Sequence, residues 1–259
     1  MSTPDTRAPY LPAAQWSYAD TVVALGAGYL AAIVVGTFYL VATGKSSADQ
    51  LGVVELSITL IAQSAGHLGV AAWLSQNRGT GSWAEDFGLR IRSRDVWGLA
   101  VGVLLQLAVA VLISPIVELF APENPPQQGV AEIAERVQGA AGRIVFVVLI
   151  VGVAPVVEEI LFRAMLLSRL RRAMGAWPAI LTSAAVFAII HFILDQNAVL
   201  AVPGLFVVGI VLAWFALRDG DLSMPIFVHA GVNLTGALVL IFGSELADAA
   251  DRVGAHLFG

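Results

Sequence analysis

The sequence predicts an all-α, polytopic membrane protein, a bundle of about seven transmembrane helices. Of its 259 residues 58% are hydrophobic and only 13% are charged, and the mean hydropathy is +0.82. Soluble domains contain about 25% charged residues. The apolar runs are continuous rather than alternating, which favours spanning helices over the strands of a membrane barrel.

Seven apolar runs are long enough to cross a bilayer, since about 20 apolar residues span its hydrocarbon core. The predicted spans are residues 21–42, 53–74, 97–120, 144–167, 178–194, 199–217 and 224–242. The fifth and seventh are short. We expect one transmembrane domain over residues 21–242, between a polar N-terminal tail, 1–20, and a C-terminal tail, 243–259, that is too polar to cross.

The first three spans carry few polar signals. The first is rich in Gly, Ala and Val, which predicts a lipid-facing role. The second carries Gln63 and His67 four residues apart on one helix face, a spacing that we interpret as an interhelical hydrogen bond. After the third span, a Pro- and Gly-rich loop contains an amphipathic piece, 130–137, that could lie on the membrane surface as a lid.

Composition excludes several classes of function. The chain has no cysteine, so disulfides, thiolate metal sites and cysteine catalysis are excluded. The net charge of -5 is diffuse, and no basic patch suits a nucleic acid. We therefore expect the lipid bilayer and a peptide or membrane-protein substrate as partners.

The distribution of Lys and Arg predicts the orientation. Nine basic residues lie on the side of the N-terminus: Arg7, Arg78, Arg90, Arg92, Arg94, Arg169, Arg171, Arg172 and Arg218. Four lie on the other side: Lys45, Arg136, Arg143 and Arg252. We expect an integral protein of the cell membrane with a cytoplasmic N-terminus, and an odd number of spans then places the C-terminus outside.

The fourth span carries three charged residues inside an apolar run. Glu159 and Arg163 are four residues apart and can pair, whereas Glu158 is rotated by about 100° and faces elsewhere. Each such charge costs roughly 2.5–3.5 kcal/mol on insertion scales. Such residues are paired, hydrated or used in function, so this span predicts a buried active site.

Two histidines in later spans complete the pattern. Phe187 and His191 share a helix face, and so do His229 and Asn233. Glu159 lies sixteen residues before Gly175 and His191 lies sixteen after it (175 − 159 and 191 − 175), so a hairpin that turns there places them at one depth.

This set of residues suits the hydrolysis of an amide bond. A carboxylate in an apolar pocket makes a useful general base, so Glu158 could take a proton from water while a histidine orients that water. The second histidine and Asn233 could donate hydrogen bonds to an oxyanion. No serine or threonine stands in a nucleophile setting, so we expect direct attack by water.

These residues, in this order, resemble the CPBP family, which includes type II CAAX prenyl endopeptidases, bacteriocin-processing proteins and ABI-like membrane proteins. Its three motifs EExxxR, FxxxH and HxxxN are intact: Glu158, Glu159 and Arg163, then Phe187 and His191, then His229 and Asn233. The resemblance covers about residues 144–240. It implies an intramembrane endopeptidase, often classed as a metalloprotease, with a cavity open to the cytoplasmic side. It also implies that Glu158 and His191 activate water and that His229 and Asn233 form the oxyanion site.

The sequence leaves alternatives open. The chain could be a non-catalytic scaffold, as in bacteriocin immunity, or a proton-coupled transporter, because transporters also use intramembrane Glu and His. For the enzyme we favour a reaction without metal. Two His and one Glu are an accepted zinc set, and His191, His229 and Glu159 or Glu158 could supply it. The absence of HExxH argues against zinc.

Overall fold

The computed structural model describes residues 16–47, 50–120, 134 and 139–258. Of this part of the chain 89% is helical and none is strand. Seven helical segments are long and apolar enough to cross a membrane: Tyr18–Thr43, Val53–Arg78, Ser93–Phe120, Gly139–Met174, Ala176–Leu194, Gln196–Asp219 and Ser223–Gly243. They coincide with the seven predicted spans, which confirms the predicted all-α polytopic bundle.

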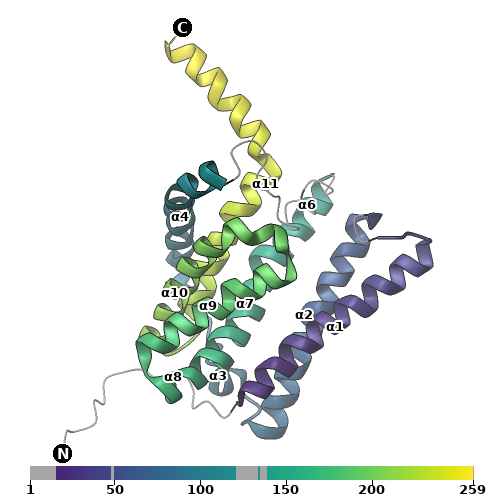
Figure 1. The fold of residues 1–259 in the computed structure, drawn as a ribbon, viewed down its shortest axis with the longest axis vertical. Helices are drawn as coiled ribbons and strands as arrows, with labels where there is room; N and C mark the ends of the chain where they lie inside the picture. Colours follow the sequence, from purple (N-terminus) through teal and green to yellow (C-terminus); the bar gives the residue numbers. More distant parts are fainter. Residues whose placement is uncertain (1–15, 48–49, 121–133, 135–138, 259) are drawn as a thin grey trace, which may run out of the picture.

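Helices α1 (Tyr18–Thr43) and α2 (Val53–Arg78) pack side by side at one edge of the bundle (Figure 1). Their backbones approach closely, because a Cβ on Gly66 would lie 2.7 Å from the Ala27 carbonyl oxygen. His67 Nδ1 is 2.9 Å from the Ala24 carbonyl oxygen and donates to it. The predicted interhelical hydrogen bond of His67 is therefore present.

The fourth span is one continuous helical rod with two π-helical stretches. Its segments are α6 (Gly139–Val147), η3 (Val148–Val153), α7 (Ala154–Glu159), η4 (Ile160–Leu167) and α8 (Ser168–Met174). Both η3 and η4 are π-helices, which are rare and frequent at functional sites. The second stretch begins directly after Glu159, and the first ends five residues before Glu158 (158 − 153). Gly175, at φ 85°, then makes the turn into α9 (Ala176–Leu194), where the sequence predicted it.

Helix α11 (Ser223–Phe258) packs against α4 (Gly98–Phe120) through glycines. A Cβ on Gly102 would lie 2.0 Å from the Val228 carbonyl oxygen, and one on Gly231 would lie 2.2 Å from the Leu99 carbonyl oxygen. Small residues let membrane helices approach in this way. This contact sets the position of α11, which carries both His229 and Asn233.

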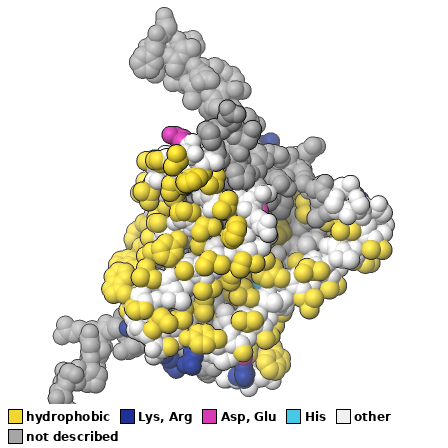
Figure 2. Space-filling model, in the orientation of Figure 1, with side chains coloured by type: hydrophobic (Ala, Val, Ile, Leu, Met, Phe, Trp, Pro, Cys, Tyr) yellow, Lys and Arg dark blue, Asp and Glu magenta, His cyan; other side chains and the backbone are white. Residues whose placement is uncertain are grey.

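The remaining elements are short or complete the bundle. They are α3 (Trp83–Asp86), η2 (Ser93–Trp97), η5 (Gln196–Ala201) and α10 (Val202–Asp219). The main core joins the fourth span to α1, α2, α9 and α10. The outer surface is largely apolar, and Figure 2 shows Lys and Arg side chains at one end of it.

Two predicted features fall at the limits of the described residues. The amphipathic piece 130–137, apart from residue 134, and most of the N-terminal tail lie outside them. The C-terminal segment is helical, since α11 continues without a break from the seventh span to Phe258 and projects beyond the other helices (Figure 1).

Candidate active site

Glu159 is the buried centre of the site. It has no exposed surface, and its two oxygens face different partners. Oε2 lies 3.2 Å from Arg163 Nε, which is the ion pair predicted from their spacing. Oε1 lies 2.9 Å from His229 Nδ1, whose N–H donates to it. The carboxylate therefore connects the fourth span to α11.

Arg163 is also fully buried and depends on an aromatic ring as well as on Glu159. Its guanidinium nitrogens make no aligned hydrogen bond within the described part of the chain, so the contact with Glu159 is electrostatic rather than directional. Its guanidinium carbon lies 4.8 Å from the centre of the Phe187 ring. A cation over an aromatic face is attracted by the ring quadrupole.

Glu158 faces the two histidines. Its Oε2 lies 3.9 Å from His191 Nε2 and 3.7 Å from His229 Nε2, and it has no hydrogen-bond partner among the described residues. Both distances are longer than the donor–acceptor distance of a direct hydrogen bond, and such spacing suits a bridging water. The side chain is 25% exposed, whereas that of Glu159 is completely covered. Glu158 is therefore the more accessible carboxylate.

The neighbours of the two histidines assign their ring protons. His191 Nδ1 lies 2.8 Å from the Phe187 carbonyl oxygen and must donate to it. Nε2 of the neutral ring is therefore an acceptor, on the side of the ring that faces Glu158. His229 donates from Nδ1 to Glu159. When its ring is protonated, Nε2 becomes a second donor.

Phe187 packs against three members of the site at once. Its ring centre is 4.5 Å from that of His191 and 5.9 Å from that of His229, in addition to its contact with Arg163. The sequence placed Phe187 on the same helix face as His191. The structure shows that this one ring contacts both histidines and the buried cation.

Asn233 lies one turn beyond His229 and joins α11 to the π-helix η3. Its Nδ2 donates to the Ile150 carbonyl oxygen at 2.9 Å. One amide proton and the side-chain oxygen are not used by this bond. The structure thus brings five of the six predicted residues into mutual contact and anchors the sixth beside them.

A family model covers this part of the chain. Residues 140–235 match the family described as type II CAAX prenyl endopeptidase Rce1-like. We call residues 140–235 the Rce1-like domain because of this similarity. This finding confirms the resemblance drawn from the three motifs, all of which lie within the matched residues. Neither a curated protein nor a solved structure matches the chain.

Two residues outside the Rce1-like domain, Tyr29 of α1 and His67 of α2, lie within electrostatic range of the Glu158 carboxylate. The ring centres of Tyr29 and His67 are 5.3 Å apart, and the rings meet edge to face. The spacing of Gln63 and His67 predicted an interhelical hydrogen bond, but it did not predict that His67 lies near the carboxylates. Tyr29 carries no signal in the sequence, because its position depends on the α1–α2 pairing.

The sequence left open a metal site formed by His191, His229 and Glu159 or Glu158. Among the described residues, no group of three or more His, Asp or Glu side chains is arranged to hold a metal ion. Glu159 faces Arg163 and His229 with its two oxygens.

Proposed function

We propose that the chain is an intramembrane endopeptidase in which Glu158 activates a water molecule that attacks a peptide carbonyl. The observation that carries this proposal is the position of Glu158 Oε2, which lies 3.9 Å and 3.7 Å from two histidine Nε2 atoms without a direct partner among the described residues. The Rce1-like domain, a protease family, supports peptide hydrolysis. A membrane-anchored peptide of the CAAX type is the proposed substrate.

Each step of the reaction uses a group already described. Water donates one hydrogen to Glu158 and one hydrogen bond to His191 Nε2, and its oxygen bonds to the carbonyl carbon. Protonated His229 donates from Nε2 to the oxyanion, and the free amide proton of Asn233 is the second donor. Glu158 then passes its proton to the amide nitrogen as the C–N bond breaks. The products are an amine and a carboxylic acid, which keeps the second hydrogen of the water until it ionises.

The test is cleavage of a panel of farnesylated and unmodified C-terminal peptides by purified protein. Glu158→Gln should lower the rate by about 10²–10⁴, the usual contribution of a general base. Glu118→Gln is the matched control, because Glu118 is exposed on α4. Both variants should unfold at the wild-type temperature. An active Glu158→Gln protein would refute the base assignment, and a wild type that cleaves no peptide would favour a scaffold or a transporter.

We also propose that the N-terminus lies in the cytoplasm. The nine-to-four distribution of basic residues supports this orientation. The chain lacks cysteine, so single cysteines at positions 76, 127 and 244 can be labelled without background. Position 76 is chosen because Gln76 is exposed at the end of α2. Position 76 should react from inside, and positions 127 and 244 from outside. Labelling of positions 76 and 127 from the same side would overturn the orientation.

A further inference from the structure

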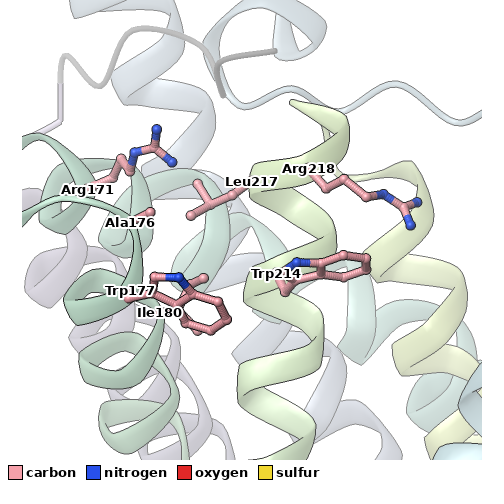
Figure 3. Close-up of a pocket in the computed structure, with 7 residues that line it drawn as sticks. All are labelled: Arg171, Ala176, Trp177, Ile180, Trp214, Leu217 and Arg218. Carbon is pink, nitrogen blue, oxygen red and sulfur yellow. The ribbon is translucent and has the colours of Figure 1, made fainter. Parts of the chain in front are cut away.

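A pocket lies at the arginine-rich end of the bundle. Its volume is about 260 Å³, and it is formed by the end of α8, the start of α9 and the end of α10. Its lining includes Arg171, Trp177, Ile180, Trp214, Leu217 and Arg218. Figure 3 shows the two indole rings projecting from neighbouring helices, with Arg171 and Leu217 toward the helix ends.

The pocket is separate from the candidate active site. Trp177 precedes His191 by fourteen residues on α9 (191 − 177), which at 1.5 Å per residue is about 21 Å along the helix. No residue of the catalytic set lines the pocket. The pocket is therefore not part of the site proposed for peptide hydrolysis.

The chemistry of the pocket is cationic at its end and apolar below. Arg218 is held in place by Asp219, with Nε–Oδ1 at 2.6 Å and Nη2–Oδ2 at 2.8 Å, and by the Trp214 ring at 4.8 Å. Arg171 has no ion-pair partner within the part of the chain that the structure describes. One full positive charge is thus available there. Helix α9 also begins at this point without a side-chain cap, which adds the positive end of its dipole.

The surface beside the pocket has the character of a lipid-facing wall. Trp177 is 63% exposed, Leu181 46% and Trp214 41%. Tryptophans at this level are typical of the boundary between headgroups and hydrocarbon. The pocket can hold a phosphate headgroup but not two acyl chains, and the exposed apolar side chains continue from it along the bilayer.

We propose that this pocket binds the headgroup of an anionic phospholipid. Arg171 contacts the phosphate, Arg218 contributes the second wall, and the acyl chains lie against Trp177, Leu181 and Trp214. The exposed apolar surface distinguishes a lipid from a soluble phosphate, which would gain nothing from it. Conversely, the arginines distinguish an anionic lipid from a zwitterionic one.

Tryptophan quenching by brominated lipids tests the proposal on the intact chain in nanodiscs. Brominated phosphatidylglycerol should quench emission at concentrations about fivefold lower than brominated phosphatidylcholine, the preference expected from one basic side chain at an anionic site. Arg171→Gln should abolish this preference and Arg171→Lys should retain it. Trp177→Phe combined with Trp214→Phe should remove the lipid-selective part of the signal.

Controls separate the pocket from general surface charge. Arg90→Gln with Arg94→Gln changes two arginines of the same side outside the pocket and should keep the preference. Trp73→Phe, a 58% exposed tryptophan on α2, should also keep it. A preference that survives Arg171→Gln in a protein with wild-type unfolding temperature would overturn the proposal. Competition by inorganic phosphate as strong as by the lipid would overturn the lipid assignment.

Discussion

The guanidinium carbon of Arg163 lies 4.8 Å from the centre of the Phe187 ring in the interior of the bundle. Phe187 belongs to α9 and Arg163 to the π-helix η4, so the contact joins the two spans that meet at Gly175. The same ring packs against His191 and His229. The buried cation and the histidines of the site therefore share one hydrophobic support.

Phe187→Leu should lower the free energy of unfolding by about 2 kcal/mol, because it removes a desolvated cation–π contact. Phe192→Leu is the control on the same helix, where the ring is 38% exposed, and should change stability by about 0.5 kcal/mol at most. Thermal unfolding in detergent measures both. Equal effects of the two substitutions would contradict a specific role for Phe187.

Arg163→Ala should destabilise the protein by about 3–5 kcal/mol, because it leaves Glu159 buried without its cation. Arg163→Met combined with Glu159→Gln should recover part of the loss, since replacing both charges by neutral groups is often tolerated. Unfolding temperature and the yield of folded protein provide the measurement. If the double variant is as unstable as Arg163→Ala, the unpaired charge is not the cause.

Gly231→Ala should separate α11 from α4 and displace His229. The added Cβ would lie 2.2 Å from the Leu99 carbonyl oxygen, and overpacking of this kind costs about 1–3 kcal/mol. Gly236→Ala is the control on the same helix, where a Cβ meets nothing within 4 Å. It should leave stability unchanged or raise it by up to about 1 kcal/mol through helix propensity. Peptide cleavage should fall in the first variant only.

Asp86, in α3 outside the membrane spans, should make stability depend on pH. Burial alone raises the pKa of its carboxyl, but hydrogen bonds from Ser75, Thr80 and Gly81 outweigh burial and hold the pKa below its ordinary value. The folded pKa is lower than the unfolded value of about 3.9. The stabilisation that the ionised Asp86 carboxylate gives to the folded state is therefore complete above that pH. It is lost as the pH falls through the folded pKa.

Asp86→Asn should accordingly lower the free energy of unfolding by about 1.5–3 kcal/mol at neutral pH, which is the range for hydrogen bonds to a charged group. The difference from the wild type should shrink as the pH falls below about 3.9. Glu85→Gln changes an exposed neighbour and should have no such profile. A stability difference that stays constant down to low pH would contradict the argument.

The sequence was sufficient for the spans and for contacts that depend on helical spacing. Hydropathy located all seven helices because lipid demands long apolar runs. The Glu159–Arg163 pair follows from a separation of four residues within one rod. The approach of Glu158 to His191 agrees with the turn at Gly175, which places the two helices at matching depth.

Contacts that depend on helix packing could not be derived in this way. The His229–Glu159 hydrogen bond requires the close approach of α11, which the glycine contact with α4 permits. The π-helical stretches have no recognisable sequence signal, although they flank both glutamates. One amide proton of Asn233 donates to a carbonyl of η3, a contact that no residue spacing indicates.

The final prediction is that the reaction proceeds without a metal ion. Glu159 is occupied by Arg163 and His229, and no group of three ligands is arranged for a metal among the described residues. A catalytic zinc site commonly has three protein ligands. Exhaustive chelation should therefore leave peptide cleavage within about twofold of the untreated rate, a change of less than about 0.5 kcal/mol in the barrier.

Elemental analysis of the same active preparation should find less than one zinc for each chain. Glu158→Gln provides the reference for true inactivation, because it removes the base and leaves both histidines in place. Stoichiometric zinc, together with activity that chelation abolishes and added zinc restores, would overturn the prediction. His191 and His229 would then become metal ligands through the Nε2 atoms that face Glu158, and the acceptor role assigned to His191 would be wrong.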